Sequence, residues 1–258
     1  RLGFDGIYIS GSVLSNDLGY PDIGLTTQTE VAYRGRQISR ATRLPSFIDI
    51  DTGFGEPMNA TRTVQELIEM GLAGCHIEDQ ENPKRCGHLD GKSLVSVDAM
   101  LKKIKAASLA KKLDENFLIC ARTDARASEG LDKAIDRAKA YIDAGAEMIF
   151  PEALANEAEF EKFRAAVKVP LLANMTEFGK SRLLTAKELE NLGFNLVIYP
   201  VTTLRLAMKA VEDGLKSILQ NGTQEQVVEK MQTRKELYDL THYEDYNQFD
   251  QSIFNFKL

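Results

Sequence analysis

The chain is poor in cysteine, and this scarcity already excludes some classes of protein. Its 258 residues include three cysteines, Cys75, Cys86 and Cys120, with no C-x-x-C pair, so a disulfide framework is excluded. No apolar run approaches the roughly 18 residues of a membrane-spanning helix. Basic side chains number 32 against 38 acidic ones, and the net charge of −6 disfavours binding to nucleic acid or to anionic membranes. We therefore expect a soluble, cytoplasmic protein of enzyme size.

A short pattern repeats along the chain: a helical stretch, a glycine, and then a short apolar run. It occurs around Gly71, Gly145 and Gly193, and a similar run follows Gly3. A glycine just past a helix tolerates the left-handed conformation that ends the helix, and a buried strand follows. The pattern predicts seven strands, at residues 6–10, 46–51, 74–79, 117–124, 147–151, 170–174 and 195–199. Their alternation with helices predicts a parallel sheet.

Polar side chains stand at the end of almost every predicted strand. In a (β/α)₈ barrel all these carboxyl ends meet at one rim, where active sites lie, whereas an open doubly wound sheet would gather them at one crevice. We favour the α/β class with a (β/α)₈ barrel. Its first βα unit is expected before Arg1, because Gly3 resembles a helix stop. We expect residues 1–258 to form one barrel domain whose C-terminal helical segment covers about 203–258.

The C-terminal segment is predicted to hold two helices, at 203–219 and 224–241. Thr223 and Gln226 have the spacing of a capping box at the start of the second helix. Aromatic residues then gather in the tail, at Tyr243, Tyr246, Phe249, Phe254 and Phe256. So many aromatic side chains are expected to be covered, either by a partner subunit or by the chain's own barrel, and the sequence leaves both open.

Four carboxylates end two adjacent predicted strands. Asp49 and Asp51 stand two residues apart, so on a strand their side chains point the same way, and Glu78 and Asp79 end the next strand. Like charges so close together repel unless a cation or proton lies between them. Carboxylate oxygens suit Mg²⁺, for which Mn²⁺ can substitute, so we expect Asp49 and Asp51 to bind it, with a further direct or water-bridged ligand from Glu78 or Asp79. The alternative is that these carboxylates cap loops or pair with Arg122.

Cys86 lies in a polar loop, Lys84-Arg85-Cys86-Gly87-His88. Two cations and a histidine beside a thiol predict a lowered thiol pKa and a role in catalysis. The alternative is an incidental surface cysteine.

Three arginines are candidates for binding an anionic substrate: Arg122 at a strand end, Arg205 after the last strand and Arg234 on the C-terminal helix. Each of them could instead form a surface salt bridge. Two glycine-rich stretches do not have the spacing of nucleotide-binding motifs, and the three histidines are too scattered for a zinc motif.

The cysteine loop resembles the catalytic loop of the isocitrate lyase and phosphoenolpyruvate mutase superfamily, and the resemblance extends over essentially the whole chain. It is carried by residues 8–11, 18–22, 49–55, 76–80, 121–124, 150–152, 174–179 and 232–234. The cysteine form of the loop is typical of the carbon–carbon lyases of this superfamily. Arginine at position 85 separates the chain from isocitrate lyases, which usually carry a second lysine there and large insertions that this chain lacks.

The resemblance implies a Mg²⁺-dependent lyase that cleaves a methyl-substituted isocitrate into pyruvate and succinate. It implies Mg²⁺ near Asp49 and Asp51, with Glu78 in or near its shell of ligands. It implies that Cys86 donates a proton, within a catalytic set of Cys86, Tyr8, Lys84, Arg85 and His88, with Tyr8 as the base. It implies substrate contacts from Ser10, Gly11, Ser12, Gly87, Arg122, Glu152, Asn174, Thr176, Arg205 and Arg234, although Ser12 replaces the usual glycine. It also implies a homotetramer that exchanges a C-terminal helix between subunits.

Several other functions stay open. An isocitrate lyase, an oxaloacetate decarboxylase or a phosphonate enzyme would have the same fold, and the last two should lack Cys86. A catalytically dead barrel that only binds a partner should have lost Asp51, Cys86 or Arg122, and all three are present.

Overall fold

The computed structural model describes residues 1–89 and 91–255. The chain divides into two compact units, residues 1–204 and 205–258, and each is described by itself. The first unit contains the seven strands, which are β1 (Ile7–Ile9), β2 (Ser46–Asp49), β3 (Gly74–Glu78), β4 (Leu118–Thr123), β5 (Met148–Pro151), β6 (Leu172–Asn174) and β7 (Leu196–Ile198). All seven predicted strands are confirmed, and no predicted end differs from the observed one by more than two residues.

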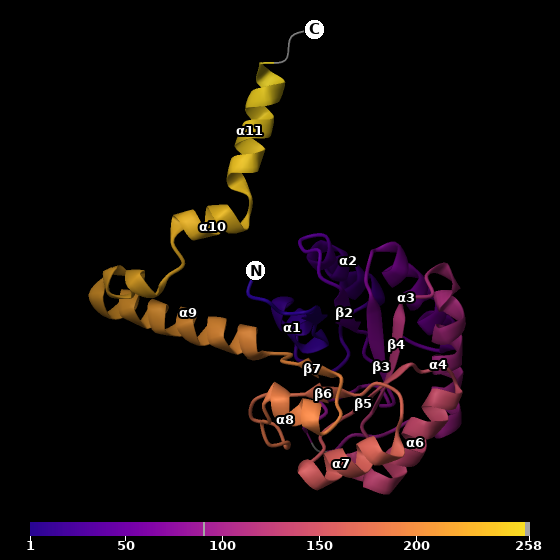
Figure 1. Ribbon diagram of the computed structural model, residues 1–258. Coiled ribbons are helices and arrows are strands. Elements are labelled where there is room, and N and C mark those ends of the chain that lie inside the picture. The colour runs from indigo at the N-terminus through magenta and orange to yellow at the C-terminus, as the bar shows by residue number, and fades with distance from the viewer. Residues whose placement is uncertain (90, 256–258) are drawn as a thin grey trace. The chain divides into compact units, whose positions relative to one another are not determined.

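The strands pair in parallel and in the order of the chain. One sheet has the order β1-β2-β3-β4-β5 and the other joins β6 to β7, while a parallel bridge between Ile149 and Leu171 links the two (Figure 1). A doubly wound sheet would reverse the strand order at its centre, so this alternative is excluded. The eighth strand that we expected before Arg1 lies outside the chain and stays a prediction.

Helices follow the strands and cover the sheet from outside. They are α1 (Gly11–Asp17), α2 (Gln28–Ser39), α3 (Pro57–Glu69), α4 (Val97–Ala110), the 3₁₀ turn η1 (Lys111–Leu113), α5 (Ala125–Ser128), α6 (Leu131–Asp143), α7 (Glu157–Ala166) and α8 (Ala186–Asn191). Gly71, Gly145 and Gly193 have φ angles of +80°, +114° and +81°, the left-handed conformation predicted for helix stops.

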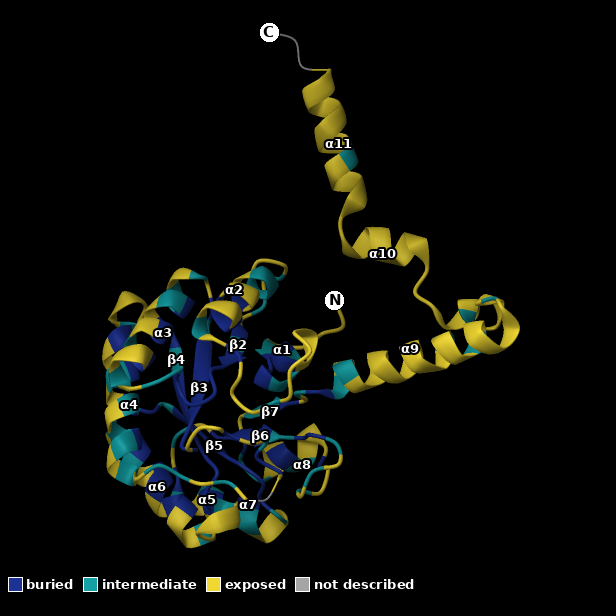
Figure 2. Cartoon of the chain, turned by 180° about the vertical axis from the view of Figure 1, so that it is seen from behind, coloured by how far each residue is buried: buried dark blue, intermediate teal, exposed yellow. Residues whose placement is uncertain are grey.

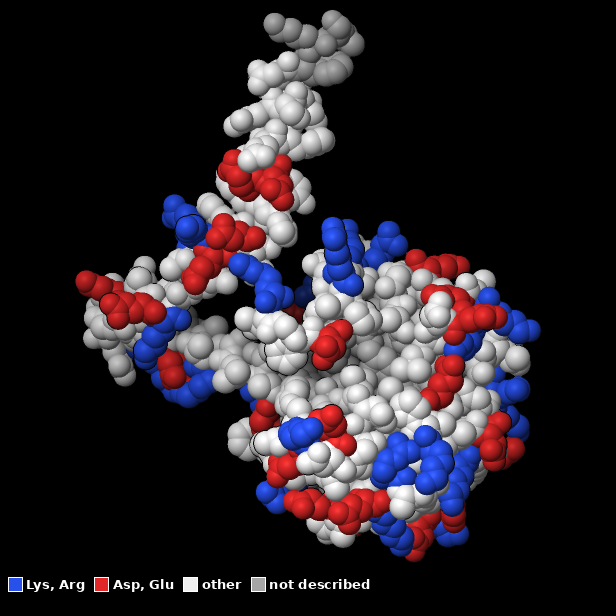
Figure 3. Space-filling view, in the orientation of Figure 1, with Lys and Arg blue, Asp and Glu red and all other residues white. Residues whose placement is uncertain are grey.

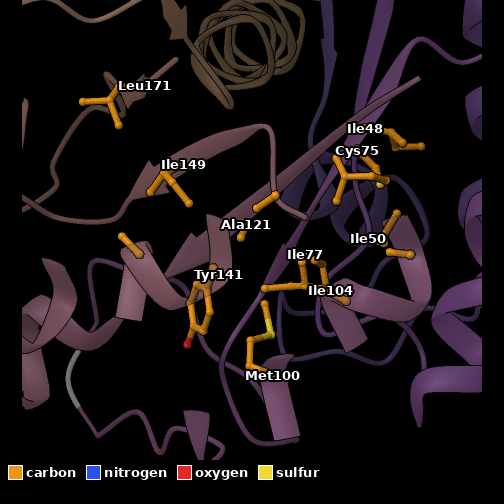
Figure 4. Packing of buried hydrophobic residues seen from close by; sticks show 14 of the residues in the cluster. Ile48, Ile50, Cys75, Ile77, Met100, Ile104, Ala121, Tyr141, Ile149 and Leu171 are labelled. Atoms are coloured by element: carbon orange, nitrogen blue, oxygen red, sulfur yellow. The ribbon is translucent and has the colours of Figure 1, made fainter. Parts of the chain in front are cut away.

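Both faces of the strands are buried, as a parallel sheet between two apolar layers requires. On the outer face Ile77 of β3 packs with Met100 and Ile104 of α4 (Figure 4). A second, smaller cluster contains Cys120, Met148, Phe150, Leu172 and Ile198. Because Cys120 and Ala121 are neighbours on β4 and belong to different clusters, the smaller cluster lies on the opposite, interior face. Apolar side chains of the two clusters therefore cover both faces of the strands, and Figure 2 shows the strands as buried and the exposed residues mainly on the helices.

The second unit is helical. It contains most of α9 (Thr202–Asn221), the 3₁₀ segment η2 (Glu225–Lys230), α10 (Arg234–Leu240) and α11 (Tyr243–Phe254). The predicted helix at 224–241 is correct for its second part, where α10 lies, and wrong for its first part, because residues 225–230 form a 3₁₀ segment and Met231 is extended. The capping box forms at Thr233 and Glu236 and starts a new helix there, in place of the predicted box at Thr223.

Charges of both signs are interspersed over the outer face of the first unit that Figure 3 shows. Within residues 1–89 and 91–255, no helix has the length and apolar character that crossing a membrane requires.

Candidate active site

Two aspartates converge on Gly11 where β2 ends. The backbone N–H of Gly11 donates to Asp49 Oδ2 at 3.3 Å, and the backbone N–H of Asp51 donates to Asp49 Oδ1 at 2.9 Å. A Cβ on Gly11 would lie 2.8 Å from Asp49 Oδ2 and 3.3 Å from Asp51 Oδ1. Gly11 is therefore required for the two carboxylates to approach the start of α1 so closely.

The convergence arises differently from our prediction. We expected both aspartates on one strand, with side chains on the same side. The strand ends at Asp49, and Asp51 lies beyond it in the left-handed conformation with φ of 47°. For a residue other than glycine this conformation costs about 1–2 kcal/mol. A strained turn, rather than strand alternation, aims the Asp51 carboxylate.

Lys84 of the cysteine loop is bound by two carboxylates. Its ammonium Nζ lies 2.7 Å from Asp51 Oδ1 and donates to Asp22 Oδ1, and the lysine side chain is 3% exposed. Burial, and then the neighbouring Asp49, raise the pKa of Asp51 to about 6. Asp49 and Asp51 together therefore carry more negative charge than Lys84 offsets. A divalent cation would neutralise the remaining negative charge.

The donor set can be compared with the needs of Mg²⁺. Both carboxylate oxygens of Glu78 are buried without a hydrogen-bond partner, and burial raises its pKa well above the ordinary value. Within residues 1–89 and 91–255, no three His, Cys, Asp or Glu side chains form a group that could hold a metal ion. Mg²⁺ usually takes one or two protein carboxylates and keeps several waters, so Asp49 and Asp51 fit it. A direct bond from Glu78 stays a prediction.

Arg122 joins the ends of β3, β4 and β5. Its guanidinium makes two bonds to Asp124, 2.9 Å from Nε to Oδ2 and 3.2 Å from Nη2 to Oδ1, and lies 3.3 Å from Glu78 and from Glu152. It also stacks over the ring of Phe150 at 5.0 Å. Burial lowers its pKa, but the three carboxylates outweigh burial and hold the pKa above the ordinary value. Arg122 is a fixed positive charge at the floor of the site.

The cysteine loop lies directly on this arginine. A Cβ on Gly87 would come within 2.4 Å of Arg122 Nη2 and 2.3 Å of Glu152 Cγ, so only a glycine allows the backbone so close. His88 Nε2 lies 2.7 Å from Glu152 Oε1, while its Nδ1 accepts the backbone N–H of Lys180 at 2.9 Å. The half-buried Cys86 is thus held beside Arg122 and Glu152.

The predicted lowering of the Cys86 pKa is wrong. Burial raises the pKa of the thiol, and this effect exceeds the lowering by the backbone N–H of His88 and by Arg122. Two of the groups expected to lower it, Lys84 and His88, are engaged by carboxylates, and Arg85 is exposed with its backbone held by Gln80. Cys86 is therefore a protonated thiol near neutral pH, the form of a proton donor rather than a nucleophile.

Tyr8 lies in the interior and is paired with a histidine. Its hydroxyl lies 2.8 Å from His76 Nε2, which in turn lies 3.6 Å from Asp49 Oδ1. Burial and Asp49 raise the pKa of Tyr8 well above its ordinary value, and burial lowers the pKa of His76 to about 4. At neutral pH the pair is a phenol and an uncharged imidazole.

Most other predicted substrate residues lie at the same rim. Ser10 is buried and its Oγ accepts the N–H of Val13, which caps α1, and Ser12 is half-buried in that helix. Asn174 Nδ2 donates to Glu152 Oε2 at 3.3 Å, and its buried Oδ1 has no hydrogen-bond partner. Thr176 is buried just beyond β6.

Two predicted residues belong to the second unit. Arg205 and Arg234 are exposed there, and their part in the site stays a prediction.

The sequence argument overlooked several residues of the site. His76, Asp22, Lys92 and Asp124 all contact predicted site residues or their loop. Asp124 had a usable signal, because it is the last residue of the predicted strand 117–124 and therefore lies at the rim. Lys92 had none, since a lone lysine in a polar loop resembles any solvated lysine.

Comparison of the sequence with known proteins identifies the family of the chain. The sequence model of the family described as phosphoenolpyruvate phosphomutase matches residues 1–219, and the chain belongs to this family. A protein of Corynebacterium glutamicum named "Probable 2-methylisocitrate lyase 2" is 61% identical over 99% of this chain and 83% of its own length. The 2-methylisocitrate lyase of Halalkalibacterium halodurans is 52% identical over 98% of this chain and 83% of its own length.

Solved structures match the fold closely. The 2,3-dimethylmalate lyase, described as a member of the PEP mutase/isocitrate lyase superfamily, has a TM-score of 0.91 at 29% identity and covers 99% of this chain and 87% of its own. Phosphonopyruvate hydrolase in complex with oxalate and Mg²⁺ has a TM-score of 0.86 at 28% identity, covering 96% and 87%. The predicted barrel class, with C-terminal helices, is confirmed.

Proposed function

We propose that the protein is a carbon–carbon lyase that cleaves 2-methylisocitrate into pyruvate and succinate. The observation that carries the proposal is the cysteine loop, whose Gly87, next to Cys86, lies directly against Arg122 and Glu152, at the same rim as the paired Asp49 and Asp51. The identity of 61% and 52% to proteins named for this activity supports the substrate. The reaction belongs to the methylcitrate cycle of propionate catabolism.

We assign Asp49 and Asp51 to holding Mg²⁺, with Glu78 as a further direct or water-bridged ligand. When bound, Mg²⁺ would supply a Lewis acid that lowers the pKa of the substrate hydroxyl. The Mg²⁺ named with phosphonopyruvate hydrolase supports this ion for the family. Calorimetric titration of wild type and Asp51→Ala with Mg²⁺ tests the site, and equal affinities would remove the assignment.

The remaining steps belong to side chains of the chain. The hydroxyl proton passes to a base, for which we keep Tyr8. Tyr8 takes this proton as its own phenolic proton passes to His76 Nε2, 2.8 Å away, so no free phenolate forms. The charge of Asp49, 3.6 Å from His76, favours the imidazolium that results. The electron pair of the O–H bond forms the carbonyl of pyruvate as the carbon–carbon bond breaks. The pair left on the other carbon, next to a carboxylate, takes the proton of Cys86 and gives succinate.

The substrate carries several carboxylates, which need cationic and hydrogen-bonding partners. We assign the Arg122 guanidinium to one of these carboxylates, and we keep Ser10, Gly11, Ser12, Gly87, Glu152, Asn174 and Thr176 as further substrate contacts. We keep Lys84, Arg85 and His88 as the supports of the cysteine loop, and Arg205 and Arg234 as further anion-binding candidates.

A product assay tests the proposal. Purified protein with Mg²⁺ and 2-methylisocitrate should release pyruvate, followed by lactate dehydrogenase coupling, and an equal amount of succinate. Isocitrate should release glyoxylate much more slowly. The Cys86→Ala variant should cleave neither 2-methylisocitrate nor isocitrate. Faster release of glyoxylate from isocitrate would make the protein an isocitrate lyase. Failure to cleave either acid, with decarboxylation of oxaloacetate or hydrolysis of phosphonopyruvate instead, would overturn the proposal.

We further propose that the protein is a homotetramer in the cytoplasm, whose C-terminal segment packs on a neighbouring subunit while residues 1–258 remain one functional domain. Apolar side chains of α9 and α11, including Leu215, Leu219, Phe249 and Phe254, are more than half exposed in the single chain. Such a row of apolar groups supports packing against another surface.

A further inference from the structure

Lys92 connects the cysteine loop to the barrel. Its ammonium Nζ lies 2.9 Å from Asp124 Oδ1 and also donates to the backbone carbonyl of Gly87. The side chains of Lys92 and Asp124 are 2% and 0% exposed. A buried lysine that binds a carboxylate and a backbone carbonyl at once holds the carbonyl in place relative to the carboxylate.

The carbonyl that Lys92 holds belongs to the residue next to the reactive thiol. The backbone of Gly87 lies against Arg122 and Glu152, with no space for a Cβ. The next residue, His88, is anchored by its own side chain to Glu152. The carbonyl of Gly87 is instead bound by Lys92. This ammonium is therefore the contact that anchors the Gly87 carbonyl to the barrel.

Asp124 is itself fixed, so it can serve as an anchor. Its backbone N–H donates to Asp79 Oδ1 at 2.9 Å, and its carboxylate receives two bonds from Arg122. Asp79 also accepts the hydroxyl of Tyr141 at 2.8 Å. If the charge of Lys92 is removed, Asp124 stays paired with Arg122, so the large cost of an unpaired buried carboxylate does not arise.

We propose that Lys92 is a positioning residue for Cys86, which it fixes over Arg122 and Glu152 by tying the Gly87 carbonyl to Asp124. This role rests on the proposed function only in that the positioned thiol is the proton donor of that reaction. In this role Lys92 acts through the Gly87 carbonyl.

The test compares Lys92→Met, Lys92→Arg and a control, Lys111→Met. Methionine keeps the length of the side chain without its charge, and arginine restores a cationic donor. Lys111 is a suitable control because it is also mostly buried and paired with a carboxylate, Glu147, at 2.6 Å on another part of the barrel. Two quantities are measured: kcat and KM for 2-methylisocitrate, and the rate at which iodoacetamide alkylates Cys86, with the fully buried Cys75 and Cys120 as references.

Lys92→Met should lower kcat at least about tenfold, since a displacement of about 1 Å at a reacting group can cost 10²-fold, while KM changes less than about threefold. Alkylation of Cys86 should become several-fold faster, because the released thiol is more accessible and less shielded from water. In Lys92→Arg, kcat and the rate of Cys86 alkylation should return part of the way to their wild-type values. In Lys111→Met, both quantities should equal those of the wild type.

Unchanged kcat and unchanged Cys86 alkylation in Lys92→Met would overturn the proposal. Faster alkylation of all three cysteines would also overturn it, because Lys92 would then support the fold rather than the thiol. If the wild type does not cleave 2-methylisocitrate but Lys92→Met still exposes Cys86 selectively, the proposed function fails and the positioning role holds.

Discussion

Replacing Gly11 with alanine tests whether its missing side chain lets two aspartates form a Mg²⁺ site. The added Cβ would lie 2.8 Å from Asp49 Oδ2, whereas ordinary contact begins at 3.4 Å. The carboxylate must therefore retreat by about 0.6 Å (3.4 − 2.8). Asp49 is only 6% exposed, and its other oxygen accepts the N–H of Asp51, so the movement disturbs both carboxylates.

We expect Gly11→Ala to weaken the binding of Mg²⁺. Mg²⁺ demands near-ideal octahedral geometry at about 2.0–2.1 Å, and such sites tolerate displacements of only about 0.5 Å. We expect the Mg²⁺ dissociation constant of Gly11→Ala to rise at least about tenfold, or about 1.4 kcal/mol. Gly11 is the first residue of α1 and its φ is not positive, so alanine should favour the helix by about 0.5–1 kcal/mol and partly offset the clash. Tm should then change by less than about 4 °C.

Calorimetric titration with Mg²⁺ and thermal unfolding measure the two effects separately. Gly214→Ala is the matched control, since a Cβ on Gly214 in α9 would meet no atom within 4 Å. It should leave Mg²⁺ affinity unchanged. Wild-type affinity in Gly11→Ala would refute the reasoning, because the convergence over Gly11 would then be unrelated to metal binding. Loss of cooperative unfolding would equally refute the claim that the clash stays local.

Three further predictions concern the thiol and the assembly. Cys86→Ser should lower kcat by at least about 10², while substrate affinity changes less than about tenfold, and a serine variant with most of its kcat would remove Cys86 as the proton donor. Because burial raises the Cys86 pKa, the active protonated form should persist above the ordinary thiol value of about 8.5 and be lost only as pH rises further. A kcat profile that falls on the basic side near pH 7 would contradict this. Light scattering at micromolar concentration should show an oligomer, and a monomer would contradict the packing proposed for α9 and α11.

The strands could be predicted from the sequence because their signals are local. Gly71, Gly145 and Gly193 each end a helix with positive φ, and this depends only on the residues next to them in the chain. A short apolar run forms a strand wherever both its faces are buried. The helix at 224–241 could not be predicted in the same way. The spacing of a capping box occurs at Thr223 and again at Thr233, and the box forms at Thr233, so the spacing alone did not show where the helix begins.

The site divides along a similar line. Sequence alone determined which residue types stand at the strand ends and in the cysteine loop, since position along a strand fixes the rim on which a side chain lies. The tertiary structure decided which charges meet. Lys84 binds Asp22, 62 positions away, and His88 binds Glu152, so neither is left to lower the pKa of Cys86. Burial then raises that pKa, because the cost of removing charge from water depends on packing by residues that are distant in the chain.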